Sequence, residues 1–142
     1  MSVSASVTPI TDAACAPKPL AWFDGALIEA DSVQAGLTTH AMHYGSGVFE
    51  GVRAYATESG AAVFRLPEHL ERMRKGADMF GMAFDVAAAT AAVLATLRAN
   101  HHRDAYIRPL AWYGEGSFGL DVEGHTPHLM VATTATQVHL NG

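Results

Sequence analysis

A chain of 142 residues that is 49% hydrophobic and 16% charged is long enough to form one globular domain with a substantial core. Its net charge of −5 and its scattered basic residues exclude a typical nucleic-acid-binding surface, and no apolar run is long enough to span a membrane. The single cysteine, Cys15, excludes an intrachain disulfide and suits a reducing cytoplasm, where we expect the protein to be located.

Residues 1–19 are rich in Ser, Thr and Pro, and we expect them to form a flexible leader. They have neither the basic start nor the continuous apolar core of a signal peptide. Two short apolar runs follow, 20–23 and 27–29, with Asp24 and Gly25 between them. Because Asp and Gly tolerate the positive φ of a type I′ turn, this pattern predicts a β-hairpin.

The most informative stretch of the sequence is 40–55, HAMHYGSGVFEGVRAY. Gly45 and Gly47 predict a loop at its start. The β-branched and aromatic residues that follow predict a strand over 48–55, with 61–66 as its partner strand. A polar, glycine-rich loop that leads into an apolar strand is a common support for a binding site, although an ordinary loop–strand junction has the same composition.

Two helices are expected next. Pro67 is tolerated at a first helical position, and Glu68 suits the positive N-terminal end of a helix. Apolar residues at helical spacing extend this helix over 69–82. A second helix is expected to start at Asp85 and to end near Asn100, with apolar residues along one face.

Two further strands are expected over 106–112 and 127–134, joined by a long glycine-bearing loop at 114–124. Strand pairs followed by helices and more strands predict an α+β fold, with an antiparallel or mixed sheet and two main helices. The histidines do not form a metal-binding pattern, because no cysteine or carboxylate pair completes a set of ligands with His40 and His43 or with the adjacent pair at 101–102.

Three segments resemble motifs of the branched-chain amino acid aminotransferases, which belong to the class IV, fold-type IV pyridoxal phosphate enzymes. They read YGxxVFEGxRxY from residue 44, FRLxEHxxR from residue 64 and AYIRPL from residue 105. Their order and spacing cover roughly residues 20 to 135. The resemblance implies the small N-terminal domain of this fold over 20–137, followed by the start of an interdomain linker at 138–142. The larger domain is then absent from this chain.

The resemblance assigns the cofactor phosphate to Arg72. The guanidinium group suits this role, because its planar fork matches phosphate oxygens and it stays charged at any working pH. Periodicity alone favours a solvated arginine on the first helix. We expect Arg72 and the Tyr106–Arg108 strand to open toward a shared cavity.

Tyr44, Tyr106 and Arg108 match family residues that bind substrate carboxylates. The resemblance implies that Arg108 and Tyr44 bind the side-chain carboxylate of glutamate, with the tyrosine reaching in from another subunit. Tyr106 lies on the same strand face as Arg108 and is expected to donate to the α-carboxylate. The structural alternatives are a buried ion pair between Arg108 and an acidic residue, and a core tyrosine at 106.

Five further residues are assigned to the substrate pocket. Phe49 would form the wall of an apolar side-chain pocket, Gly51 would allow a ligand close to the backbone, and Arg53 would order the site loops. Taken alone, Phe49 reads as a core residue. The resemblance places Phe118 and Leu120 in a loop that contributes apolar contacts to the neighbouring subunit's pocket.

The implied reaction is amino transfer between leucine, isoleucine or valine and 2-oxoglutarate, with pyridoxal 5′-phosphate as cofactor. This chemistry needs a lysine to hold the cofactor as a Schiff base. The only lysines are Lys18 and Lys75, and neither resembles the family's lysine segment, so we expect the Schiff-base lysine beyond Gly142. The chain alone would then be inactive, and the full-length form a homodimer or higher homo-oligomer.

Two other functions remain open from the sequence. One is a non-catalytic binding or assembly module of the same fold. The other is a different class IV enzyme, such as a D-amino acid transaminase or an aminodeoxychorismate lyase. Those enzymes usually carry a different loop from HYGSGVFEGVR, which favours the branched-chain group.

Overall fold

The structure is a computed structural model that describes residues 18–136. Most of the expected leader and the expected linker at 138–142 lie outside these residues. The first described residues are bound to the fold, because Lys18 Nζ lies 2.7 Å from Glu29 Oε2 and the Ala30 N–H donates to the Pro19 carbonyl. The strands are β1 (Leu20–Phe23), β2 (Ala26–Glu29), β3 (Gly47–Phe49), β4 (Val52–Thr57), β5 (Gly60–Val63), β6 (Ala105–Tyr113) and β7 (Pro127–Ala135).

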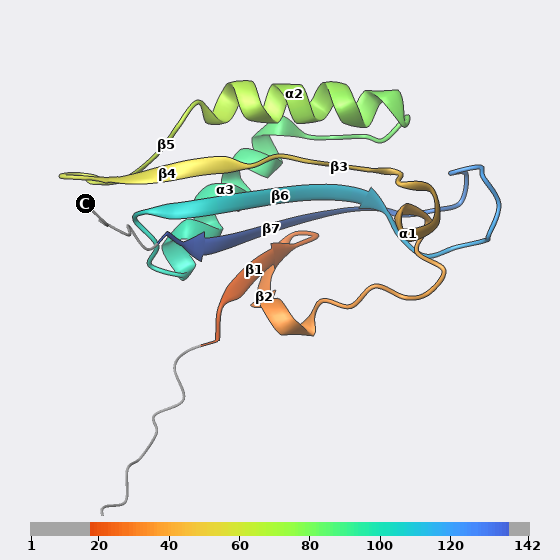
Figure 1. Ribbon diagram of the computed structural model, residues 1–142, viewed down its shortest axis with the longest axis horizontal. Coiled ribbons are helices and arrows are strands. Elements are labelled where there is room, and N and C mark those ends of the chain that lie inside the picture. Colours follow the sequence, from red (N-terminus) through yellow and green to blue (C-terminus); the bar gives the residue numbers. More distant parts are fainter. Residues whose placement is uncertain (1–17, 137–142) are drawn as a thin grey trace, which may run out of the picture.

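Among residues 18–136 the helices are α1 (His40–Tyr44), α2 (Leu66–Met79) and α3 (Val86–Ala99), with a short 3-10 turn, η1 (Ala30–Ser32). The strands form one sheet in the order β2-β1-β7-β6-β4-β5, and β3 also pairs with β6. Every strand pair is antiparallel. This confirms the predicted α+β fold and shows that its sheet is antiparallel and not mixed. Helices α2 and α3 cover one face of the sheet, and we call the other face the open face (Figure 1).

Strand β6 divides its side chains between these two faces, because successive residues of a strand point in opposite directions. Its odd-numbered residues are buried beneath the helices, whereas Tyr106, Arg108, Leu110 and Trp112 lie on the open face. Residues that lie opposite each other on neighbouring strands point to the same face of the sheet. Phe49 lies opposite Leu110 and Arg53 opposite Tyr106, so both belong to the open face.

The expected continuous strand over 48–55 is interrupted at Glu50 and Gly51, between β3 and β4. The register does not slip, because Phe49 pairs with Leu110 and Val52 with Ile107. Pro109 lies opposite Glu50 and has no N–H to donate. The Glu50 N–H still donates to the Pro109 carbonyl at 3.1 Å, so half of the usual pair of hydrogen bonds remains.

The prediction of a loop at 40–47 was only partly correct, because this segment contains the one-turn helix α1. Gly45 ends this helix in the left-handed conformation, with φ at 67°, and its N–H donates to the Ala41 carbonyl at 2.9 Å. A positive φ is accessible to glycine at little cost. Five residues are too few to show a helical period of apolar residues. The sequence therefore indicated the glycine that ends the helix, but not the helix itself.

The two long helices form close to their expected positions. Pro67 lies in the first turn of α2, and Asp85 caps α3 by accepting hydrogen bonds from two backbone N–H groups. Their apolar faces meet the sheet in a core that includes Leu70, Val93 and Ile107, each fully buried. Across the part of the chain that the structure describes, no helix has the length and apolar character needed to cross a membrane.

Candidate functional site

Five of the residues selected from sequence come together on the open face, and we call this group the strand site. Arg108 Nη2 donates to Tyr106 Oη at 2.5 Å, and its guanidinium lies 4.5 Å from the centre of the Phe49 ring. The Tyr106 hydroxyl lies close above Gly51, where a Cβ would be only 2.6 Å away. Arg53 completes the strand site as the cross-strand partner of Tyr106.

The strand site is positively charged and incompletely hydrogen-bonded. Arg53 Nε and Arg108 Nε are both buried, and neither has a hydrogen-bond partner among residues 18–136. No carboxylate within this range forms an ion pair with either arginine, so the alternative of a buried ion pair for Arg108 is not what the structure shows. Buried guanidinium N–H groups without partners favour a ligand that brings carboxylate oxygens.

Two aromatic members of the strand site are accessible to a ligand. Phe49 is 61% exposed and Tyr106 is 36% exposed, so neither is the core residue that the structural alternatives described. Phe49 also borders an apolar cavity of about 420 Å³ beneath the 33–47 segment. The cavity is lined by Val33, Met42, Leu110, Trp112 and Met130 among others. An apolar side chain bound at the strand site would find an apolar surface beside Phe49.

Arg72 is held on the helix-covered side of the sheet by Glu50. Its Nε lies 2.5 Å from Glu50 Oε1 and its Nη2 lies 2.6 Å from Glu50 Oε2, while His69 Nδ1 lies 2.9 Å from the same Oε2. The Glu50 side chain is 6% exposed, and that of Arg72 is 71% exposed. The hydrogen bond from Arg72 lowers the pKa of Glu50 below its usual value, despite the opposing effect of burial.

The expected shared cavity for Arg72, Tyr106 and Arg108 is not found among residues 18–136. Glu50 and Gly51 are adjacent and point to opposite faces, so Glu50 binds Arg72 on one face and Gly51 contacts Tyr106 on the other. The cavity beside Arg72 has a volume of about 290 Å³. It is lined by Phe64, Arg65, Glu68, His69 and Arg72.

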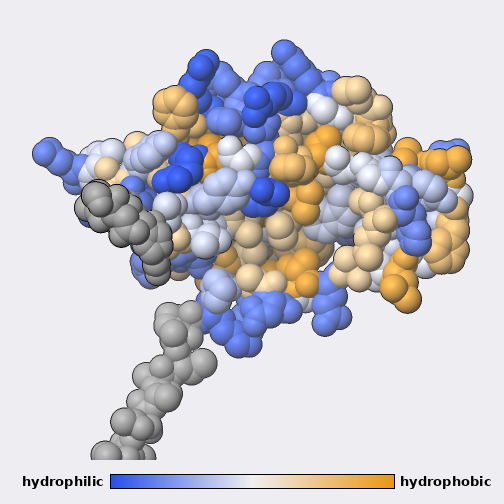
Figure 2. Space-filling model, in the orientation of Figure 1, coloured by the Kyte–Doolittle hydropathy of each residue, from blue (hydrophilic) through white to orange (hydrophobic). Residues whose placement is uncertain are grey.

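Tyr44, Phe118 and Leu120 form a second group, which we call the loop cluster. The Tyr44 hydroxyl donates to the Phe118 carbonyl at 2.6 Å, and the His43 ring meets the Phe118 ring edge-on. The side chains of Phe118 and Leu120 are 64% and 79% exposed. Figure 2 shows hydrophobic surface at this end of the molecule, where α1 and the 114–126 loop lie. The structure therefore separates the loop cluster from the strand site.

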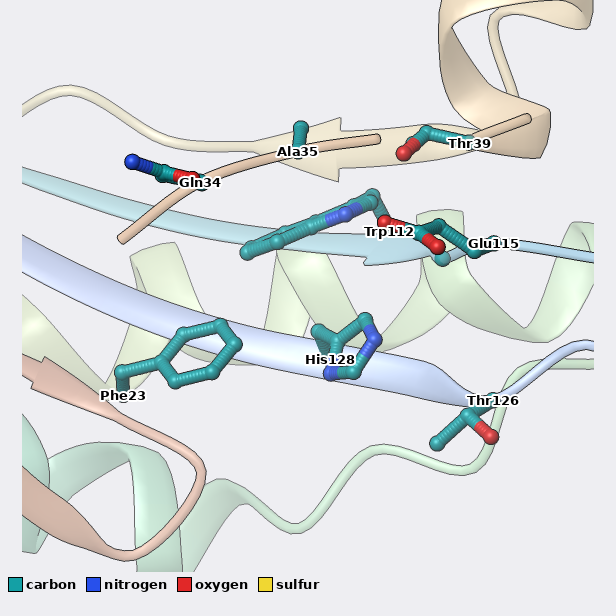
Figure 3. A pocket seen from close by; sticks show the side chains of 9 residues that line it. Phe23, Gln34, Ala35, Thr39, Trp112, Glu115, Thr126 and His128 are labelled. Carbon is teal, nitrogen blue, oxygen red and sulfur yellow. The ribbon is translucent and has the colours of Figure 1, made fainter. Parts of the chain in front are cut away.

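Sequence reasoning missed a second cavity, next to the apolar one. It has a volume of about 320 Å³, and Figure 3 shows the rings of Phe23, Trp112 and His128 along its floor, with Glu115 at one end. His128 Nδ1 lies 2.5 Å from Asp24 Oδ2, which joins the β1–β2 turn to β7. No local pattern could reveal this site, because its residues come from four separate segments. Glu50 was also missed as the partner of Arg72, although strand alternation places it on the face opposite Gly51.

The family Amino-transferase class IV matches residues 47–141 of this chain. The branched-chain-amino-acid aminotransferase of Pseudomonas aeruginosa is 39% identical over 113 residues, and that of Escherichia coli K12 is 32% identical over 114 residues. Each alignment covers 78% of this chain and 37% of the relative.

Solved structures give the same result. A branched-chain amino acid aminotransferase from T.th., in complex with N-(5′-phosphopyridoxyl)-L-glutamate, superposes with a TM-score of 0.79 at 36% identity. The superposition covers 84% of this chain and 41% of that protein. The chain thus spans well under half the length of these relatives. The family match extends over most of the chain and includes the strand site, and we conclude that this chain belongs to the class IV aminotransferases.

Proposed function

We propose that this chain provides the substrate-binding and phosphate-binding part of a branched-chain amino acid aminotransferase. The reaction would move an amino group between leucine, isoleucine or valine and 2-oxoglutarate, in the cytoplasm. The observation that carries the proposal is the strand site, where Arg53 and Arg108 each present a buried Nε–H without a partner in the described part of the chain. Both substrate classes carry carboxylates that can accept these hydrogen bonds.

The strand site has a distinct task for each part of the substrate. Arg108 and the Tyr106 hydroxyl would bind carboxylate oxygens, and Arg53 would add positive charge beside them. Phe49 and the apolar cavity next to it would contact the branched side chain. The relative from T.th. binds a phosphopyridoxyl derivative of glutamate, which supports a glutamate-type substrate for the family's second half-reaction.

Arg72 is suited to hold the phosphate of pyridoxal 5′-phosphate. Glu50 occupies Nε and one N–H of Nη2, which leaves Nη1 and one further N–H of this exposed guanidinium available. Arg65 lines the same cavity and adds a second positive charge, which its exposed pair with Glu68 partly offsets. When bound, pyridoxal 5′-phosphate supplies the electron sink for amino transfer. Arg72 would fix its position, and Glu50 would hold the guanidinium in place.

The proposal assigns two contributions to other parts of the assembly. Lys75 is exposed on α2, and we propose that neither it nor Lys18 is the Schiff-base lysine, which would lie in a larger domain outside these 142 residues. Residues 20–137 would then form the small domain. The loop cluster would contribute Tyr44, Phe118 and Leu120 to the site of a second copy in a homodimer or larger assembly.

Binding of 2-oxoglutarate tests the strand site directly. We expect NMR signals of Tyr106 and Arg108 to shift as 2-oxoglutarate is added to the isotope-labelled chain. Arg108→Gln should weaken binding by roughly tenfold to a hundredfold, because it removes a charge-assisted hydrogen bond. Arg98→Gln, at an exposed arginine in the last turn of α3, is the matched control and should leave the affinity unchanged. Equal affinity of the wild type and Arg108→Gln would refute the proposed function.

The contact between Gly51 and Tyr106 allows a second test. Gly51→Ala should push the Tyr106 hydroxyl away, since the added Cβ would lie 2.6 Å from it. We expect the hydrogen bond to Arg108 to be lost and 2-oxoglutarate to bind about tenfold more weakly. Gly119→Ala is the control, because the nearest atom to its added Cβ would lie at an ordinary 3.5 Å. Unchanged Tyr106 signals in Gly51→Ala would contradict this account of the site.

An activity measurement tests the assignment of the lysine. The chain should show no amino transfer when it is mixed with leucine, 2-oxoglutarate and pyridoxal 5′-phosphate. Without leucine, the expected absorption spectrum is that of the free cofactor. Turnover by the chain would refute the assignment, whether it persists in Lys75→Ala or is lost there, and its loss would identify Lys75 as the Schiff-base lysine.

A further inference from the structure

Two buried histidines lie where the 114–126 loop meets α1. His40 is 2% exposed and His125 is 7% exposed, and their ring centres are 4.7 Å apart with the rings edge to face. Histidine is seldom buried this completely without a specific set of hydrogen bonds. Neither residue belongs to the strand site or to the loop cluster.

Both imidazoles bind backbone carbonyls of the loop. His40 Nε2 lies 3.3 Å from the Leu120 carbonyl oxygen, and His125 Nε2 lies 3.2 Å from that of Ser117. Because a carbonyl only accepts hydrogen bonds, each ring must carry a proton on Nε2. His40 Nδ1 then accepts from the Ser46 hydroxyl at 2.7 Å. His125 Nδ1 is buried and has no partner among residues 18–136.

The loop fits tightly around the second of these rings. A Cβ at Gly116 would lie 2.4 Å from His125 Nε2, so only glycine lets the backbone approach the ring this closely. The Phe118 carbonyl is bound by Tyr44, which means that the carbonyls at 117, 118 and 120 all accept from aromatic or imidazole side chains. The side chains of Phe118 and Leu120 are mostly exposed, so their own packing contributes little to the position of the loop.

We propose that His40 and His125 are positioning residues, which fix the positions of Phe118 and Leu120 in the loop. The pair binds the loop through its backbone and leaves the two apolar side chains free to contact a ligand or a second copy of the chain. Their role in a substrate pocket rests on the proposed function. The positioning itself depends only on the contacts within this chain.

Backbone dynamics and histidine NMR test the proposal. In the wild-type chain at mildly alkaline pH, ring nitrogen spectra should show the Nε2–H form for His40 and His125. In His125→Phe, which keeps a ring and loses the donor, the backbone order parameters at 117–120 should fall below about 0.6, the range of a flexible segment. His125→Gln retains an N–H donor and should restore order parameters close to those of the wild type.

Two further variants separate loop positioning from a general loss of stability. Gly116→Ala removes no hydrogen-bonding group, yet it should displace the His125 ring and lower the order parameters at 117–120 to a similar extent. His101→Asn, at an exposed residue with φ at 54°, is the control and should leave the loop unchanged. Unchanged order parameters at 117–120 in both His125→Phe and Gly116→Ala, or an equal fall in β6, would overturn the proposal.

The measurements on the loop need neither cofactor nor substrate. At concentrations where the chain is a monomer, the affinity of the strand site for 2-oxoglutarate should be the same in His125→Phe and the wild type, because the proposed contribution of the loop cluster is to the site of a second copy. A more flexible loop with normal 2-oxoglutarate binding is the expected result. Failure of the wild-type chain to bind 2-oxoglutarate would refute the proposed function and leave the positioning role standing.

Discussion

Leu70→Ala is expected to lower the free energy of unfolding by about 3 kcal/mol. Leu70 is fully buried on α2 and belongs to the core beneath the sheet, with Val93 and Ile107. Truncation removes apolar contacts and leaves a cavity that a close-packed core closes only in part. Urea denaturation should show a lower midpoint with an unchanged slope.

Leu37→Ala is the matched control, because it makes the same chemical change at a leucine that is 84% exposed. We expect its effect to stay within about 0.5 kcal/mol. A loss below about 1 kcal/mol in Leu70→Ala would mean that α2 is not fixed against the sheet as described. The position of Arg72, which lies on the same helix, would then be in question too.

Glu50→Gln is expected to lower the free energy of unfolding by about 2 kcal/mol at neutral pH, because a buried carboxylate that binds Arg72 and His69 is replaced by an uncharged amide. This loss of unfolding free energy is smaller than for a fully buried ion pair, because the Arg72 side chain is 71% exposed and screened by water.

The effect of Glu50→Gln should depend on pH. The pKa of Glu50 lies below its ordinary value of 4.5 in the folded state, so its stabilisation is present above about pH 4.5 and is lost as the pH falls through the folded-state pKa. The wild type and Glu50→Gln should therefore converge in acid. Glu71→Gln is the control, because Glu71 is far more exposed than Glu50 in its pair with Arg74 and should have a much smaller effect. A difference that does not change between neutral and acid pH would exclude the carboxylate as its cause.

Local signals predicted much of the fold. The hairpin at Asp24 and Gly25, the cap at Asp85 and the strand over 106–112 each depend on residues that are adjacent in the chain, so a sequence pattern contains the needed information. The residues of the strand site were selected by the resemblance to the family, and alternation then placed Tyr106 with Arg108 and Phe49 with Gly51 on shared strand faces. Joining these two strands on one face required the register of β6, which the structure provides.

Features that depend on distant partners could not be predicted in this way. The interruption at Glu50 depends on Pro109 lying opposite it, and the Glu50–Arg72 pair depends on α2 packing against β3. Helix α1 was missed because a single turn has no apolar period. The cavity in Figure 3 combines β1, the 34–39 segment, β6 and β7, and each of these segments alone reads as an ordinary strand or connection.

The attachment of the 114–126 loop through backbone carbonyls has an evolutionary consequence. Hydrogen bonds to the main chain do not depend on which side chains stand at 118 and 120. Replacing these two residues therefore changes the shape and polarity of the exposed surface at little cost to folding. A lineage that carries this scaffold can change this surface through point mutations at the loop tip, while its core and its strand arginines stay intact.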